Sequence, residues 1–139
     1  MQYVTMGDVK LSRIVRGFWR LAGPRPGDWN ITDEALREMI AGCLERGVTT
    51  FDAADVYGRG QCEVQLGRVL STFPREDYQI VTKAGICWNH ETMSSYYDTS
   101  YDYLVSACHA ALERLQCGYI DLFLIHREDP MLDPHEAGL

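Results

Sequence analysis

The sequence predicts an α/β fold built on a parallel sheet, and two observations support this prediction. Short apolar runs rich in β-branched residues alternate with stretches whose apolar residues recur at helical spacing. Three of the predicted strands also end in a polar side chain, namely Asp52, Lys83 and His126. Because parallel strands bring their carboxyl ends to one rim, we expect these three groups to lie close together there.

The composition fits an ordinary globular domain, and we expect residues 1–139 to form a single domain. The chain has 46% hydrophobic and 24% charged residues, and its formal net charge of −7 argues against a nucleic acid or an acidic membrane as partner. No apolar run reaches the ~18 residues of a membrane helix, and the first ten residues do not resemble a signal peptide. We therefore expect no membrane partner and a cytoplasmic location.

The cysteines and histidines do not suggest a metal site. The cysteines are odd in number, and no Cys-x-x-Cys pair occurs, so we expect reduced thiols and no metal. The cysteines are Cys43, Cys62, Cys87, Cys108 and Cys117. The histidines are His90, His109, His126 and His135.

The first predicted element is a short β-hairpin at the N-terminus. Residues 2–5 and 9–11 form its two runs, and the pair Gly7-Asp8 between them is typical of a turn. Residues 13–18 follow as the first strand of the parallel set. The glycines and prolines between residues 23 and 27 then indicate a loop.

A helix and a second strand complete the first βαβ unit. Asn30 or Thr32 is suited to cap the helix, and Gly47 is typical of a helix C-terminus. Residues 49–52 form the next strand. The apolar stripe of the helix consists of Leu36, Met39, Ile40, Cys43 and Leu44.

The same alternation continues to the end of the chain. A short helix with apolar residues between 64 and 70 precedes a strand at 78–83. A polar segment, 88–100, separates that strand from a third helix with an apolar stripe at 104–115. The strand at 120–126 is the fourth of the set, and its near-continuous apolar character is expected where both faces are covered.

This order implies a right-handed wound parallel sheet, either open or closed as a barrel. The first strand is not followed by Gly-x-Gly-x-x-Gly, and the chain contains no Gly-x-x-x-x-Gly-Lys-Ser/Thr, which lowers the odds of a dinucleotide-binding Rossmann fold or a P-loop. We therefore favour a (β/α)8 TIM-barrel type, which typically needs ~250 residues. The chain would correspond to such a barrel truncated to about its first four βα units, with an added N-terminal hairpin.

The predicted rim suits proton transfer to an oxygen atom. Tyr57 follows Asp52 by five positions, so its phenol is expected above the strand ends. An ion pair between Asp52 and Lys83 would place a cation near Tyr57 and lower its pKa from ~10, which makes the phenol a plausible general acid. His126 could orient and polarise a carbonyl oxygen.

These motifs resemble those of the aldo-keto reductases. The segments 51–58 (Phe-Asp-Ala-Ala-Asp-Val-Tyr-Gly), Thr82-Lys83 and Ile125-His126 resemble the family's Asp, Tyr, Lys and His tetrad in order and placement. Gly17-Phe18-Trp19 and Tyr119–Leu122 support the resemblance. It implies the reduction of small aldehydes or ketones to alcohols by a hydride from NADPH.

The resemblance also implies roles for single residues. Tyr57 would donate the proton, Lys83 and Asp52 would tune it, and His126 would orient the substrate. For Trp19 and Trp88, packing in the protein interior is an equally good explanation as contact with a ligand. We expect the cofactor to contact Gly17, Phe18, Trp19 and Asp52, and the substrate to contact Trp19, Trp88 and His126.

The resemblance covers only the N-terminal half of the family's barrel, and this leaves alternatives open. The strands and loops with which the family binds most of NADPH have no counterpart, so the chain could be an inactive truncated fragment or a partner-binding module. The open sheet edges favour self-association, for example of two copies. A Schiff-base lyase acting through Lys83 is less favoured, because an ion pair with Asp52 would keep the lysine protonated.

Overall fold

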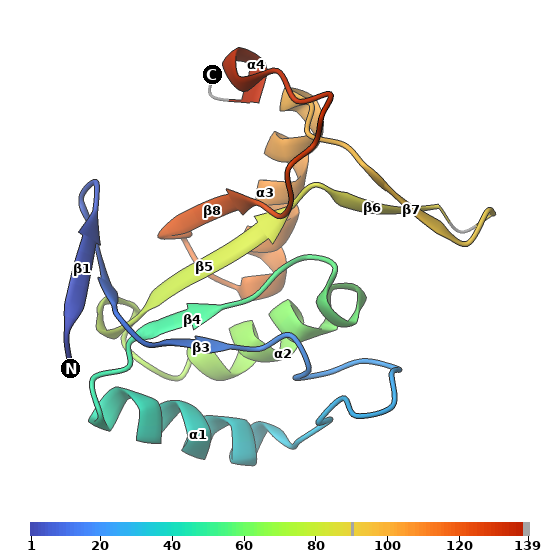
Figure 1. Cartoon of the computed structure of the whole chain (residues 1–139). Coiled ribbons are helices and arrows are strands. Elements are labelled where there is room, and N and C mark those ends of the chain that lie inside the picture. Colours follow the sequence, from blue (N-terminus) through green and yellow to red (C-terminus); the bar gives the residue numbers. More distant parts are fainter. Residues whose placement is uncertain (90, 138–139) are drawn as a thin grey trace.

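The centre of the structure, a computed structural model, is a four-stranded parallel sheet (Figure 1). The structure describes residues 1–89 and 91–137; His90, which we considered as a metal ligand, and the last two residues lie outside the described residues. The strand order is β3-β4-β5-β8, and every neighbouring pair is parallel. The four strands lie where the sequence predicted them, at Val15–Gly17, Thr50–Asp52, Gln79–Ala84 and Leu122–Ile125.

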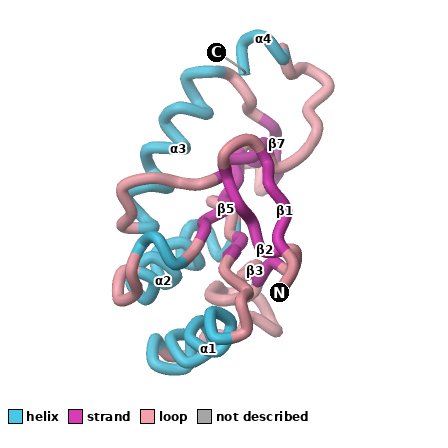
Figure 2. Tube along the Cα trace, turned by 90° about the vertical axis from the view of Figure 1, so that its left-hand side faces the viewer, coloured by secondary structure: helices cyan, strands magenta, loops and turns pink. Residues whose placement is uncertain are grey.

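Three helices connect consecutive strands, as predicted, and lie on one side of the sheet (Figure 2). They are α1 (Asp33–Glu45), α2 (Gln61–Leu70) and α3 (Tyr101–Leu115). A short helix, α4 (Pro134–Ala137), follows β8. Two single-turn 3-10 helices, η1 (Tyr57–Gly60) and η2 (Arg75–Asp77), precede α2 and β5. Among the described residues, no helix has both the length and the apolar character needed to cross a membrane.

The helices bury their apolar stripes against the sheet. Thr32 caps α1, because its hydroxyl accepts a hydrogen bond from the amide of Ala35 at 3.2 Å. Between α2 and α3 the packing is close enough to require glycine: a Cβ added to Gly67 would lie 2.4 Å from the Leu115 carbonyl. Fully buried core side chains include Phe18, Leu21, Leu36, Ile40, Phe51, Leu66, Ile80 and Leu115.

The predicted N-terminal hairpin is present as β1 (Tyr3–Met6) and β2 (Val9–Ser12), which pair antiparallel. It is fixed to the start of β4 through Ser12. The Ser12 hydroxyl accepts hydrogen bonds from the amides of Thr49 (3.1 Å) and Thr50 (3.0 Å), and the Ser12 amide donates to the Thr50 hydroxyl at 2.8 Å. The hairpin therefore lies at the amino-terminal end of the sheet, away from the rim that holds the polar residues.

A second hairpin, which the sequence did not predict, occupies much of the polar segment 88–100. It consists of β6 (Ile86–Asn89) and β7 (Ser94–Tyr97), and it extends beyond the carboxyl end of β5 (Figure 1). All side chains of β7 are exposed, so no apolar alternation marks the strand. The Asn89 side chain stabilises the bend after β6 by accepting hydrogen bonds from the amides of Glu91 (2.9 Å) and Thr92 (3.1 Å).

Candidate active site

The sheet brings the predicted polar residues together at the carboxyl ends of its strands. Asp52 is the last residue of β4 and pairs in register with Val81 of β5. Lys83 pairs in the same way with Leu124 of β8. His126 directly follows β8, and its amide continues the ladder by donating to the Ala84 carbonyl at 2.8 Å. The parallel register therefore gives the predicted grouping.

Asp52 and Lys83 form the predicted ion pair. The Lys83 ammonium lies 2.5 Å from Asp52 Oδ1 and also donates to the Ala53 carbonyl at 2.7 Å. The two side chains are only 15% and 25% exposed, in the order lysine and aspartate. An ammonium held by a carboxylate and a carbonyl is a poor nucleophile, which argues against the Schiff-base alternative.

Tyr57 stands beside this pair, at the start of η1. The Lys83 ammonium lies 5.3 Å from the centroid of its ring. The His126 ring approaches it edge-on with centroids 5.5 Å apart, and Trp19 lies on another side at 6.5 Å. Tyr57 is thus surrounded by the groups that we expected to act with it.

The predicted direction of the Tyr57 pKa was wrong. The pKa is raised, mainly because burial disfavours the phenolate and also because the negative charge of Asp52 opposes its formation. The prediction included the Lys83–Asp52 pair but not the burial of the phenol, and Asp52 compensates the lysine charge at 2.5 Å. Tyr57 is therefore held as a neutral phenol, which is the form that can donate a proton.

His126 is also held in its neutral form. Burial lowers its pKa, and the positive charges of Lys83 and Arg127 lower it further against the opposite effect of Asp52. Its buried Nδ1 atom has no hydrogen-bond partner within the described part of the chain. The imidazole therefore retains an unused polar atom, which is unusual for a buried nitrogen.

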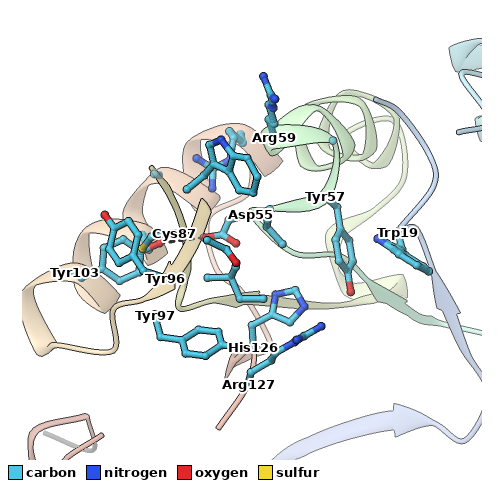
Figure 3. A pocket seen from close by; sticks show the side chains of 18 of the residues that line it. Trp19, Asp55, Tyr57, Arg59, Cys87, Tyr96, Tyr97, Tyr103, His126 and Arg127 are labelled. Carbon is cyan, nitrogen blue, oxygen red and sulfur yellow. Dashed lines mark hydrogen bonds between the residues drawn. The ribbon is translucent and has the colours of Figure 1, made fainter. Parts of the chain in front are cut away.

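A cavity of about 1060 Å³ opens in front of Tyr57 and His126 (Figure 3). Its walls come from the loops that follow the parallel strands, from the β6–β7 hairpin and from one face of α3. Trp19 and Trp88, both predicted as substrate contacts, line it and are 54% and 43% exposed. Asp52 and Lys83 are not among the lining residues, although the Lys83 ammonium lies near the Tyr57 ring.

The residues expected at the cofactor divide into two groups. Phe18 is fully buried in the core, with its ring 6.0 Å from that of Phe51, so its side chain does not reach the cavity. Gly17 pairs in register with Asp52, and a Cβ added to Gly17 would come no closer than 3.9 Å to Asp52 Oδ2. Gly17, Trp19 and Asp52 therefore remain near the site, whereas Phe18 contributes only its backbone.

Asp55 and Tyr103 form a second polar group in the same cavity, to which the sequence analysis assigned no role. The Tyr103 hydroxyl donates to Asp55 Oδ2 at 3.4 Å, and the buried Oδ1 has no partner among the described residues. Burial, reinforced by the negative charge of Glu63, raises the Asp55 pKa to about 6. The only sequence signal was the position of Asp55 in the Asp52–Gly58 loop.

Other side chains of the cavity wall also escaped prediction. Tyr96 and Tyr97 are exposed on β7 and line the cavity. Within residues 1–89 and 91–137, no cluster of three or more His, Cys, Asp or Glu side chains is arranged for a metal ion, and all five cysteines are free thiols.

Comparisons with known proteins assign this architecture to a family. The sequence model of the Aldo/keto reductase family matches residues 13–137. An uncharacterised oxidoreductase of Bacillus subtilis, YcsN, is 38% identical over 133 residues, which cover 91% of this chain and 43% of that protein. A 6-dehydroglucose reductase of Agrobacterium fabrum is 37% identical over 145 residues, covering 99% of this chain and 48% of the relative.

Solved structures agree with the sequence relatives. An aldo-keto reductase of Bacillus halodurans in its holo form superposes with a TM-score of 0.80 at 27% identity, over 99% of this chain and 44% of that one. A glycerol dehydrogenase of Gluconobacter oxydans gives a TM-score of 0.78 at 28% identity, over 97% and 42%. The chain thus spans less than half the length of these relatives, and its parallel sheet corresponds to part of their (β/α)8 barrel. Because the family model matches nearly the whole sequence, this chain belongs to the aldo/keto reductase family.

Proposed function

We propose that this chain carries the proton-donating part of a site that reduces aldehydes or ketones to alcohols with NADPH. The observation that carries the proposal is the neutral Tyr57 phenol, which faces the cavity between the Lys83–Asp52 pair and the His126 imidazole, whose Nδ1 has no hydrogen-bond partner among the described residues. These groups are positioned to stabilise negative charge on a carbonyl oxygen and to protonate it.

Each residue has a distinct task in this mechanism. His126 donates a hydrogen bond from its neutral imidazole to the substrate oxygen and so orients the carbonyl. Tyr57 transfers its phenolic proton to that oxygen as the carbonyl carbon is reduced. The nearby Lys83 ammonium stabilises the tyrosinate that remains, and Asp52 keeps the ammonium in place.

The residues near Gly17 fit one end of a nicotinamide cofactor. Asp52 uses Oδ1 for Lys83, and its Oδ2 faces Gly17, where the missing side chain leaves the surface open. Asp52, Gly17 and the exposed Trp19 would hold the reactive end of NADPH, which supplies the hydride when it is bound. The choice of NADPH over NADH is part of this proposal.

The test begins with a titration of the 139-residue chain with NADPH, followed by tryptophan fluorescence, because Trp19 lies at the site. A carbonyl-reduction assay then compares Tyr57→Phe with Tyr119→Phe, which removes the same hydroxyl from a residue outside the cavity lining. We expect Tyr57→Phe to lower turnover by roughly 10²- to 10⁴-fold, as for loss of a general acid, and Tyr119→Phe to leave it unchanged.

Two results would count against the proposal. Unchanged turnover of Tyr57→Phe would exclude this residue as the acid. The absence of saturable NADPH binding would favour the alternative that the chain alone is an inactive fragment or a partner-binding module. Since 6-dehydroglucose reductases are 36–37% identical relatives, hexose-derived aldehydes belong in the substrate screen.

Self-association and a cytoplasmic location are further parts of the proposal. Among the described residues, strand β3 pairs only with β4 and β8 pairs only with β5, so each edge of the parallel sheet could pair with another chain. The five free thiols are the form expected in a reducing compartment such as the cytoplasm.

A further inference from the structure

Three arginines without a side-chain partner in the described part of the chain all line the cavity that Tyr57 faces. They are Arg25, Arg59 and Arg127, and all three are exposed. Each of the other eight arginines makes a hydrogen bond, an ion pair or a cation–π contact. The uncommitted guanidinium groups are therefore concentrated at one place.

The charge of the cavity wall is opposite to that of the whole chain. Four arginines but only two aspartates line the cavity, whereas the formal net charge of the chain is −7. The two carboxylates are already engaged: Asp28 accepts from the backbone amide of Arg25 at 2.8 Å, and Asp55 accepts from Tyr103. Neither forms an ion pair with one of the three exposed guanidinium groups within the described residues.

The three arginines come from two sides of the cavity. Arg25 lies in the loop after β3 and Arg59 in η1, and these segments touch, because a Cβ added to Gly23 would lie 3.2 Å from the Cα of Gly58. Arg59 itself has a φ of +56°, an uncommon value for a non-glycine residue, beside Tyr57. Arg127 follows His126, and Figure 3 shows it on the opposite side of the view from Arg59, with Asp55 and Tyr57 between them.

We propose that these arginines select carbonyl substrates that carry a second, negatively charged group, such as a carboxylate, a phosphate or a sulfonate. The guanidinium group suits this task because its planar donors match the oxygens of such anions. The carbonyl would contact Tyr57 and His126, and the anionic group would lie at the arginine rim. This inference rests on the proposed function, because it names the substrate class of the same site.

The proposal is tested by binding, without cofactor or turnover. The probes are levulinate, a keto acid, and its uncharged methyl ester, titrated into the full chain at low salt and followed by tryptophan fluorescence. We expect levulinate to bind on the order of tenfold more tightly than its ester. This difference in affinity should decrease at high salt, because salt screens the charges. Arg59→Gln and Arg127→Gln should each reduce this preference roughly threefold, as for exposed charge pairs.

Matched variants separate charge from folding. Arg46→Gln removes the same charge from the exposed end of α1 and should leave the preference unchanged. Arg59→Lys and Arg127→Lys should retain most of it, because they keep the charge. Circular dichroism shows whether each glutamine variant is folded. If one is not, the salt dependence of the wild-type preference and the preference of the lysine variants still test the proposal.

Three outcomes would overturn the proposal. Levulinate and its ester could bind equally, levulinate could show no saturable binding, or the arginine variants could weaken NADPH binding while the acid-to-ester preference stays unchanged. In the last case the anion would be a cofactor phosphate. Tyr57→Phe should keep the preference, so failure of the reductase proposal is distinguishable from failure of this one.

Discussion

Burial makes Asp55 harder to ionise than an exposed aspartate, and this affects the stability of the whole chain. Its pKa rises from 3.8 to about 6 in the folded state. Between these values the folded chain binds more protons than the unfolded chain, so the free energy of unfolding falls as pH rises through this window. The carboxylate is thus a cost to stability at neutral pH.

We therefore expect Asp55→Asn to flatten this pH dependence and to stabilise the chain at pH 7 by on the order of 1 kcal/mol, allowing for partial solvent exposure. Urea denaturation across the acid range measures this effect. Asp8→Asn, in the exposed turn of the first hairpin, is the control and should preserve the slope. An equal slope in Asp55→Asn and the wild type would contradict the assignment.

The residues of the site differ in how far the sequence could predict them. Asp52, Lys83 and His126 were predictable, because each follows or ends an apolar run and parallel strands align their ends. The direction of the Tyr57 pKa was not, since it depends on burial and on how near Asp52 lies to Lys83. The arginine rim gave no signal either, because a sequence does not reveal whether an arginine finds a partner.

At the scale of elements, one buried carboxylate joins two helices to the sheet. Glu63 of α2 is fully buried and accepts hydrogen bonds from the Thr82 hydroxyl of β5 at 2.6 Å and from Arg114 of α3 at 2.7 Å. Breaking a buried pair leaves the remaining charge without its partner. We expect Glu63→Gln to lower the free energy of unfolding by about 3 kcal/mol.

Urea denaturation of Glu63→Gln and Glu45→Gln makes this test specific. Glu45 forms an ion pair with Arg46 that is about three-quarters exposed, so its loss should cost less than about 0.5 kcal/mol. Similar losses in the two variants would mean that the buried cluster contributes little.

Substitution by alanine should lower the stability of the chain at one helical glycine and raise it at another. Gly67→Ala would force a methyl group to within 2.4 Å of the Leu115 backbone, so α2 and α3 would have to separate, at a cost of about 2 kcal/mol or more. Gly42→Ala meets only the flexible end of Arg46 at 3.3 Å, and it should stabilise α1 by about 0.5–1 kcal/mol. Thermal unfolding of both variants checks this. A change of unfolding temperature in the same direction in both would contradict the described packing.

The order of strands and helices was predictable, whereas one hairpin was not. Helical and strand periodicities identified α1, α2, α3 and the four parallel strands, although the edge strands β3 and β8 have no buried residue. In the β6–β7 hairpin, all residues of β7 are exposed and only Cys87 of β6 is buried, so no hydrophobic period marks it. The third helix ends at Leu115, the last residue of its predicted apolar stripe, with Gln116 in the left-handed conformation.

At the scale of the whole molecule, the sheet has two edges that should lead to association. We expect light scattering to give a mass above that of a monomer at high concentration. Val15→Lys, a charge on the exposed edge strand β3, should shift the chain toward the monomer, whereas Val105→Lys on α3 should not. A wild-type chain that stays monomeric at every concentration would rule out this association.

The contacts of Lys83 also determine how the chain reacts with amine-directed reagents. The chain contains only two lysines, Lys10 and Lys83. Lys10 is exposed on β2, whereas the amine of Lys83 is largely enclosed and bound by Asp52 and Ala53. Apart from the N-terminus, reductive methylation of the native protein should therefore modify Lys10 alone. Protection of Lys83 from labelling would then report that the site is assembled, without the use of any substrate.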